Sequence, residues 1–110
     1  MKLTKAILGL KSTMEIENFL KDILTPNEIN AIEERWAIAK LLYKKELTYR
    51  EIATELGTST ATVTRVGRYL QGENNGYLTA LKKIKKIKIP YSLKLLYEEI
   101  NALGISFTLL

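Results

Sequence analysis

Residues 48–70 read TYREIATELGTSTATVTRVGRYL and contain the start and stop signals of two short helices. The first four letters, TYRE, fit a capping box, in which threonine and glutamate satisfy each other's free backbone amides. Gly57 ends the first helix, because glycine readily adopts the left-handed conformation that follows a helix. Thr58 or Ser59 caps the second helix, residues 60–70. The stretch therefore predicts two helices joined by a tight turn.

The spacing of small and apolar residues in this stretch is typical of a helix-turn-helix. Ala53 supplies the small residue that is needed where the two helices approach, and Gly57 lies four positions later at the turn. Four apolar side chains provide the contacts of both helices with the rest of the protein: Ile52, Leu56, Val63 and Val66. In this geometry the second helix enters the major groove of DNA while the first crosses the DNA backbone. The spacing also fits a helical hairpin that contacts no DNA, since residues 47–76 carry three basic and three acidic side chains.

The outward residues of the second helix are the candidate DNA-reading residues. Small hydroxyl and methyl side chains near its start allow close approach to base edges and to thymine methyl groups. The free amides of its first turn suit a phosphate. Arginines on both helices are placed to reach phosphate or guanine. The predicted DNA-binding residues are Arg50, Ser59, Thr60, Ala61, Thr64, Arg65 and Arg68.

Helix signals continue on both sides of this stretch. Residues 12–15 (STME) and 25–28 (TPNE) fit capping boxes, the second with proline in the first turn. The helix from residue 26 to about residue 45 is apolar over a wide part of its circumference, which suggests burial on two sides, as in a subunit interface. The same pattern fits the central helix of a monomeric core. Residues 77–89 and 92–103 predict two further helices, separated by a proline.

The composition removes several classes of function. The 110 residues include no cysteine and no histidine, which excludes disulfides, thiolate zinc sites, His-containing metal centres and Ser-His-Asp triads. We therefore expect no enzyme, no metal and no cofactor. The apolar run at residues 6–10 is too short for a secretion signal, and no segment is long and apolar enough to cross a membrane. We expect a cytoplasmic protein.

The net charge of +5 favours a polyanionic partner, but most of this charge lies outside the two-helix stretch. Residues 77–110 carry six lysines and two glutamates, which is +4 of the +5. A lysine-rich segment of this kind is a solvated face without a specific partner about as often as it is a binding surface. We expect one helical domain over residues 1–110, with the helix-turn-helix at 48–70 and a lysine-rich helical extension at 77–110.

The chain also resembles a known family. Residues 24–70, LTPNEINAIEERWAIAKLLYKKELTYREIATELGTSTATVTRVGRYL, closely resemble the Trp repressor family, and most of all its Trp-repressor-like YerC/YecD branch, which shares ELGTSTATVTRV. Residues before Ser12 and after about Lys83 lie outside this resemblance. It implies an all-α, intertwined homodimer whose two reading heads contact successive major grooves of double-stranded DNA. It also implies a sequence-specific transcriptional regulator, in particular a repressor, at a palindromic operator.

The resemblance further implies a possible effector pocket. In the Trp repressor the indole of the corepressor lies between two arginines, and other side chains meet its carboxylate and amino groups. The matching positions here are Thr25, Arg35, Thr62, Arg65 and Tyr69. Arg35 equally fits an ordinary helix arginine paired with a nearby glutamate, which is the interpretation we favour.

Two positions at this pocket, Tyr69 among the five and Val66 beside them, depart from the family pattern. Tyr69 stands where the Trp repressor has a serine, and Val66 stands where it has a glycine that makes room for the indole. Both changes add bulk where the ligand would sit, and a close-packed interior has no spare volume for a ring. We therefore expect DNA binding without tryptophan as corepressor.

Two other functions remain compatible with the sequence. The first is a protein-interaction module that has kept a helix-turn-helix scaffold. The second is an accessory factor that binds nucleic acid with little sequence preference. The small-residue face of residues 60–64, together with Arg50 and Arg68, favours DNA reading, because an interaction module has no reason to keep that face exposed.

Overall fold

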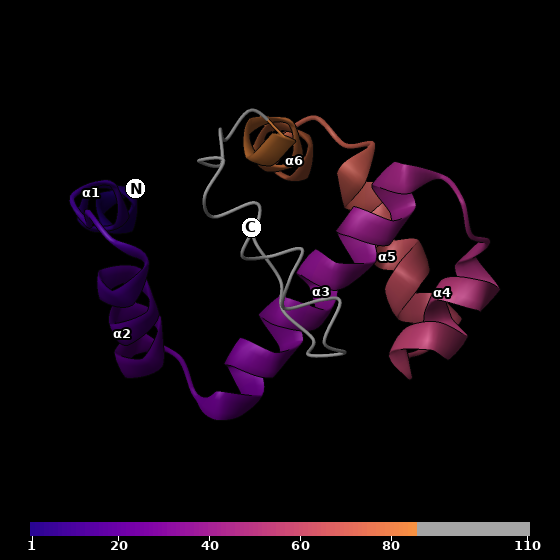
Figure 1. The fold of residues 1–110 in the computed structure, drawn as a ribbon, viewed down its shortest axis with the longest axis horizontal. Helices are drawn as coiled ribbons and strands as arrows, with labels where there is room; N and C mark the ends of the chain where they lie inside the picture. The colour runs from indigo at the N-terminus through magenta and orange to yellow at the C-terminus, as the bar shows by residue number, and fades with distance from the viewer. Residues whose placement is uncertain (86–110) are drawn as a thin grey trace, which may run out of the picture.

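The computed structural model describes residues 1–85, and this part of the chain folds into helices without strands (Figure 1). The helices are α1 (Lys2–Leu8), α2 (Thr13–Ile23), α3 (Pro26–Lys44), α4 (Tyr49–Leu56), α5 (Thr60–Leu70) and α6 (Gly76–Lys85). The all-α fold predicted from the sequence is confirmed. Within the described residues, no helix combines the length and apolar character that a membrane span requires.

Full capping boxes begin α3 and α4, as predicted. The Thr25 hydroxyl accepts a 3.2 Å hydrogen bond from the Glu28 amide, and the Glu28 carboxylate accepts one of 2.9 Å from the Thr25 amide. Thr48 and Glu51 make the same pair of bonds, at 3.1 and 3.0 Å. In each box the amide of the threonine, and then its side chain, lowers the pKa of the glutamate. The start of each helix is therefore fixed by residues three positions apart.

The capping box predicted at the start of α2 forms only in part. The Ser12 hydroxyl accepts from the Glu15 amide at 3.1 Å, as expected. The Glu15 carboxylate, however, accepts from the amide of Lys11 at 2.7 Å rather than from that of Ser12. The Glu15 carboxylate therefore bonds to the residue before the cap, and the second bond of a capping box, from the Ser12 amide to Glu15, is absent.

Helix α1 precedes the first helix that the sequence predicts. Met1, its N-cap residue, provides no side-chain hydrogen bond, and neither α1 nor α2 contains a buried residue. A short helix without a side-chain cap and without a buried stripe has little that sequence reasoning can detect.

The core of the described residues lies where α3, α4 and α5 meet. Each of these helices contributes one large, fully buried side chain: Ile38, Ile52 and Val63. Ala39, Ala53 and Val66 complete the buried cluster, and half-buried apolar side chains pack around it. Because α5 is held by buried residues of two other helices, it cannot rotate or slide without opening the core.

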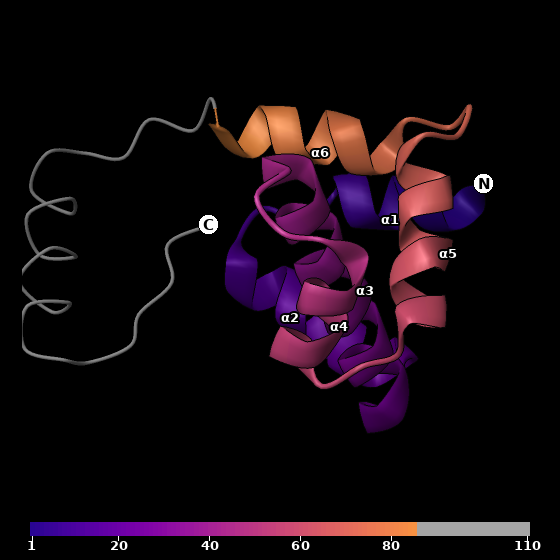
Figure 2. The same cartoon turned by 90° about the vertical axis from the view of Figure 1, so that its right-hand side faces the viewer.

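The wide apolar surface predicted for α3 is only partly covered. Ile38 and Ala39 are buried, whereas Ile32 is 46% exposed. Figure 1 shows α1 and α2 at one end of α3 and the α4–α5 pair at the other. The view turned by 90° places α6 across the top of α3 and α5 (Figure 2). The predicted helix at 77–89 begins as α6 and is described to Lys85; the predicted helix at 92–103 and the rest of the lysine-rich extension lie outside the described residues.

Candidate nucleic-acid interface

The turn between α4 and α5 is closed by backbone hydrogen bonds at a left-handed glycine. Gly57 has φ 67° and ψ 33°, a conformation that L side chains rarely adopt. The Thr58 amide donates to the Ala53 carbonyl at 2.9 Å, and the Gly57 amide donates to the Thr54 carbonyl at 3.3 Å. This pair of bonds is the Schellman motif. It turns the chain sharply enough for α5 to pack back against α4.

A side-chain hydrogen bond fastens this turn to α3. The Thr58 hydroxyl donates to the Glu34 carboxylate at 2.6 Å, in a partly buried setting. The two residues lie 24 positions apart, so no local pattern in the sequence predicts the contact. The turn is thus held both by its own backbone and by the long helix behind it.

Ser59, rather than Thr58, caps α5. The Ser59 hydroxyl accepts from the Thr62 amide at 3.1 Å and lies 2.9 Å from the Thr62 hydroxyl. Of the two alternatives that the sequence left open, the structure therefore selects Ser59 as the cap and gives Thr58 to the bond with α3.

Most of the predicted DNA-binding residues share one face of α5. A surface hollow of about 590 Å³ is lined by Thr60, Ala61, Thr64, Arg65, Arg68 and Tyr69. The first five of these were predicted from the sequence, whereas Tyr69 was assigned to the effector pocket. Arg50, in the first turn of α4, and Ser59, the cap residue of α5, are not among the lining residues.

The arginines of this region extend into solvent from the described part of the chain. Arg50, Arg65 and Arg68 are exposed, and their guanidinium groups form no ion pair or hydrogen bond with any residue in the described range 1–85. Small exposed side chains and exposed guanidinium groups therefore occur together on α5. A surface of this kind can contact phosphate oxygens and base edges at the same time.

A second hollow adjoins the first and collects most of the predicted effector residues. It measures about 300 Å³ and is lined by Arg35, Thr62, Arg65, Val66, Tyr69 and Tyr77. Thr25 is not among these residues; it is the N-cap of α3 and takes part in the capping box there. Tyr77, from the start of α6, was not predicted, because nothing in its local sequence links it to α3 or α5.

Two expectations about this second hollow are wrong. Arg35 forms no ion pair with a glutamate of the described residues, and the neighbouring Glu34 carboxylate is engaged by Thr58 instead. The bulk of Val66 and Tyr69 also does not fill the space: Val66 is 2% exposed within the core, Tyr69 is 56% exposed, and the hollow remains beside both.

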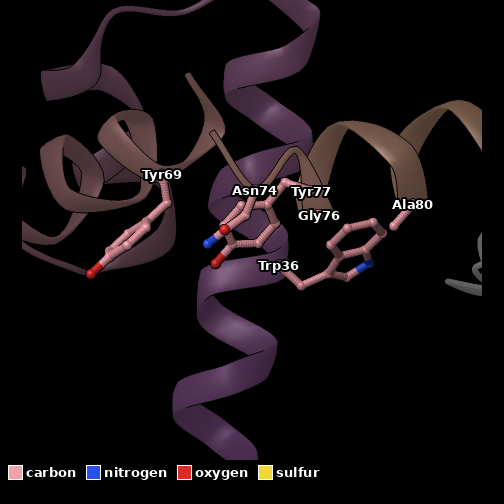
Figure 3. Close-up of a pocket in the computed structure, with 6 residues that line it drawn as sticks. All are labelled: Trp36, Tyr69, Asn74, Gly76, Tyr77 and Ala80. Atoms are coloured by element: carbon pink, nitrogen blue, oxygen red, sulfur yellow. The ribbon is translucent and has the colours of Figure 1, made fainter. Parts of the chain in front are cut away.

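A third hollow has largely aromatic walls. It measures about 470 Å³ and is lined by Trp36, Tyr69, Asn74, Gly76, Tyr77 and Ala80. Figure 3 shows the Trp36 ring beside Ala80, while Tyr69 is set apart with its hydroxyl directed away from Trp36. Tyr69 therefore borders all three hollows, and through it the outer face of α5 adjoins the spaces next to α3 and α6.

The geometry of residues 1–85 defines a class of protein: small and helical, with a long central helix that carries a pair of short helices at one end. A TrpR-like protein from Eubacterium eligens has this fold, with a TM-score of 0.70 at 38% identity, over 80% of this chain and 90% of that one. A putative Trp repressor from Staphylococcus aureus matches with a TM-score of 0.69 at 38% identity, over 80% of this chain and 87% of its own.

Sequence comparison gives the same result. The family model of the Trp repressor protein matches residues 1–85. The uncharacterized protein YerC of Bacillus subtilis is 39% identical over 93 residues, which are 84% of this chain and 88% of YerC. A Trp operon repressor homolog of Chlamydia trachomatis is 36% identical over 83 residues, which are 72% of this chain and 88% of that relative.

The chain belongs to the Trp repressor family, whose members are regulatory DNA-binding proteins. The resemblance found in residues 24–70 is thereby confirmed. Its limits need a correction at the N-terminus, because the family match includes residues 1–11, which were placed outside it.

Proposed function

We propose that the protein is a sequence-specific, DNA-binding transcriptional regulator that acts as a repressor, with α4 and α5 forming a helix-turn-helix. One observation carries the proposal. Small exposed side chains and two arginines that pair with no residue of the described range 1–85 line one face of α5, while Val63 and Val66 on the opposite face are buried in the core. A helix that is fixed from behind and polar in front is suited to enter a groove as a rigid reader.

The dimensions and chemistry of α5 suit the major groove. That groove is about 12 Å wide and admits an α-helix. Thr60 and Ala61 lie in the first turn of α5, where short side chains allow the helix to approach the bases. Arg65 and Arg68 follow at positions that reach guanine or phosphate, and Arg50 in the first turn of α4 is placed for the phosphate backbone.

We further propose that the protein acts as a homodimer. Neither α1 nor α2 buries a residue, and Leu8 and Met14 are 86% and 71% exposed. These apolar side chains and the aromatic hollow at Trp36 supply surface that a second copy would cover. A symmetric dimer places two readers about 34 Å apart, so the operator is a palindrome whose half-sites lie one DNA turn apart.

Binding-site selection from random duplex DNA tests the proposed function. We expect enrichment of one palindromic motif with the half-site spacing given above. Retention of DNA without an enriched motif would instead support a factor with little sequence preference. No retention at all would favour a protein-interaction module and overturn the proposal.

Sedimentation at micromolar concentration tests the dimer. The chain has a mass of 12.5 kDa, so a dimer has twice that mass. A sample that contains only the 12.5 kDa species would contradict the dimer.

A further inference from the structure

The hydroxyl groups on α5 are not equally available to DNA. Ser59 and Thr62 use theirs at the cap, where they lie 2.9 Å apart. The Thr64 hydroxyl donates to the Thr60 carbonyl at 2.8 Å, within the helix itself. The Thr60 hydroxyl, by contrast, makes no hydrogen bond with any residue in the described part of the chain. Among the residues that line the outer hollow, Thr60 therefore holds the one threonine hydroxyl whose proton is uncommitted.

The hydrogen bond of Thr64 decides which of its groups faces outward. Because the hydroxyl is turned back onto the carbonyl four residues earlier, its proton is used and the exposed side chain presents its Cγ2 methyl. Ala61 lies three positions earlier, so the two residues are neighbours on the same helical face. Both line the outer hollow, together with Thr60 and two arginines. The reading face thus includes a pair of methyl groups.

We infer that Ala61 and Thr64 read thymine through its C5-methyl group, whereas Thr60 acts through its hydroxyl. The inference rests on the proposed function and adds the base that the reading face selects. In the major groove, the C5-methyl of thymine is the one apolar group that a base pair presents, and a methyl pair on the protein matches it. The half-site therefore contains thymine where Ala61 and Thr64 meet the DNA.

Paired substitutions at Thr64 separate the contribution of its methyl group from that of its hydroxyl group. Thr64→Ser keeps the hydroxyl and removes the methyl, whereas Thr64→Val keeps the methyl and removes the hydroxyl. We expect T64S to weaken binding to the selected operator about fourfold per half-site, which corresponds to one buried methyl group. T64V should bind like the wild type. Thr60→Val is the matched control and should weaken binding, because it removes the available hydroxyl.

Deoxyuridine in the operator tests the same contact from the DNA side, because it differs from thymidine only by the missing C5-methyl. Replacement of the contacted thymine should weaken wild-type binding about fourfold per half-site. The same replacement should weaken T64S less than the wild type, because only the Ala61 methyl group then remains to contact the thymine methyl, and a thymine outside the half-sites serves as the control. An operator that is selected but tolerates deoxyuridine throughout, with T64V weaker than T64S, would overturn the inference and leave the proposed function intact. Failure to select any operator would overturn both.

Discussion

The Thr58 hydroxyl donates a 2.6 Å hydrogen bond to the Glu34 carboxylate and thereby joins the α4–α5 turn to the long helix α3. Short hydrogen bonds to a carboxylate are among the strong ones in proteins. Thr58 lies between the left-handed Gly57 and the cap residue Ser59, so the bond holds the chain where the direction of α5 is set.

Removal of the Thr58 hydroxyl should therefore destabilise the protein. We expect Thr58→Val to lower the free energy of unfolding by about 1.5–3 kcal/mol, the range for hydrogen bonds to charged groups. Urea denaturation measures the change. Thr58→Ser keeps a hydroxyl and should therefore retain most of the stability that T58V loses. Thr54→Val is the control, because among the described residues the Thr54 hydroxyl bonds only to the Arg50 carbonyl within its own helix α4. Equal destabilisation by T58V and T54V would contradict the role of the bond.

The packing of Tyr49 on Gly67 gives a second prediction. A Cβ atom at Gly67 would lie 2.5 Å from the Tyr49 hydroxyl oxygen, so Gly67→Ala must displace the ring. Tyr49 is 40% exposed and can move, so we expect a cost of about 1 kcal/mol in thermal or urea unfolding. Gly76→Ala meets no atom within 4 Å and should be neutral or stabilising.

Combining Gly67→Ala with Tyr49→Phe identifies the cause of the destabilisation. The phenylalanine removes the atom that lies nearest to the new methyl group, so Gly67→Ala should cost less in the Y49F background than in the wild type. If the two costs are equal, the clash with the tyrosine hydroxyl is not the reason for the destabilisation.

The capping box of α4 predicts a specific pH dependence. Hydrogen bonding by the amide of Thr48, and then by its side chain, lowers the pKa of Glu51 in the folded protein. A lowered folded-state pKa stabilises the protein above the unfolded pKa, and this contribution disappears as the pH falls through the folded-state pKa. Glu51→Gln keeps an acceptor for the Thr48 amide but does not titrate.

Urea denaturation at several pH values tests this prediction. The stability advantage of the wild type over E51Q should be constant at neutral pH and should decrease as the pH falls below about 4.3, the ordinary value for glutamate. Parallel stability curves for the two proteins down to acid pH would show that the box contributes no such dependence.

Tryptophan should not be required for DNA binding. The second hollow has room beside Arg35 and Arg65, so lack of volume is not the reason. The reason is chemical: Tyr69 stands where the Trp repressor has a serine, so the small hydroxyl that meets the ligand is missing. Calorimetric titration with tryptophan should give no saturable heat. A saturable heat, together with a DNA affinity that rises tenfold or more, would contradict this prediction.

Local signals in the sequence predicted the part of the fold that local chemistry determines. The boxes at Thr25 and Thr48 and the stop at Gly57 each depend on residues a few positions apart, and all three are confirmed. The shared outer face of α5 follows from helical periodicity in the same way. The bond from Thr58 to Glu34 could not be predicted, because it depends on how α3 and the turn pack in space.

The central claim is that the outer face of α5, supported by α4, reads DNA. The most direct test compares the wild type with a variant carrying alanine at Arg50, Thr60, Thr64 and Arg68, on the selected operator and on a scrambled duplex, across a range of salt concentrations. The account predicts that the operator affinity of the variant falls towards that for the scrambled duplex. The dependence of log affinity on log salt should also become shallower, by about one unit for each DNA phosphate that the variant no longer neutralises. Operator binding that is unchanged by all four substitutions, in a variant with wild-type helix content, would contradict the account.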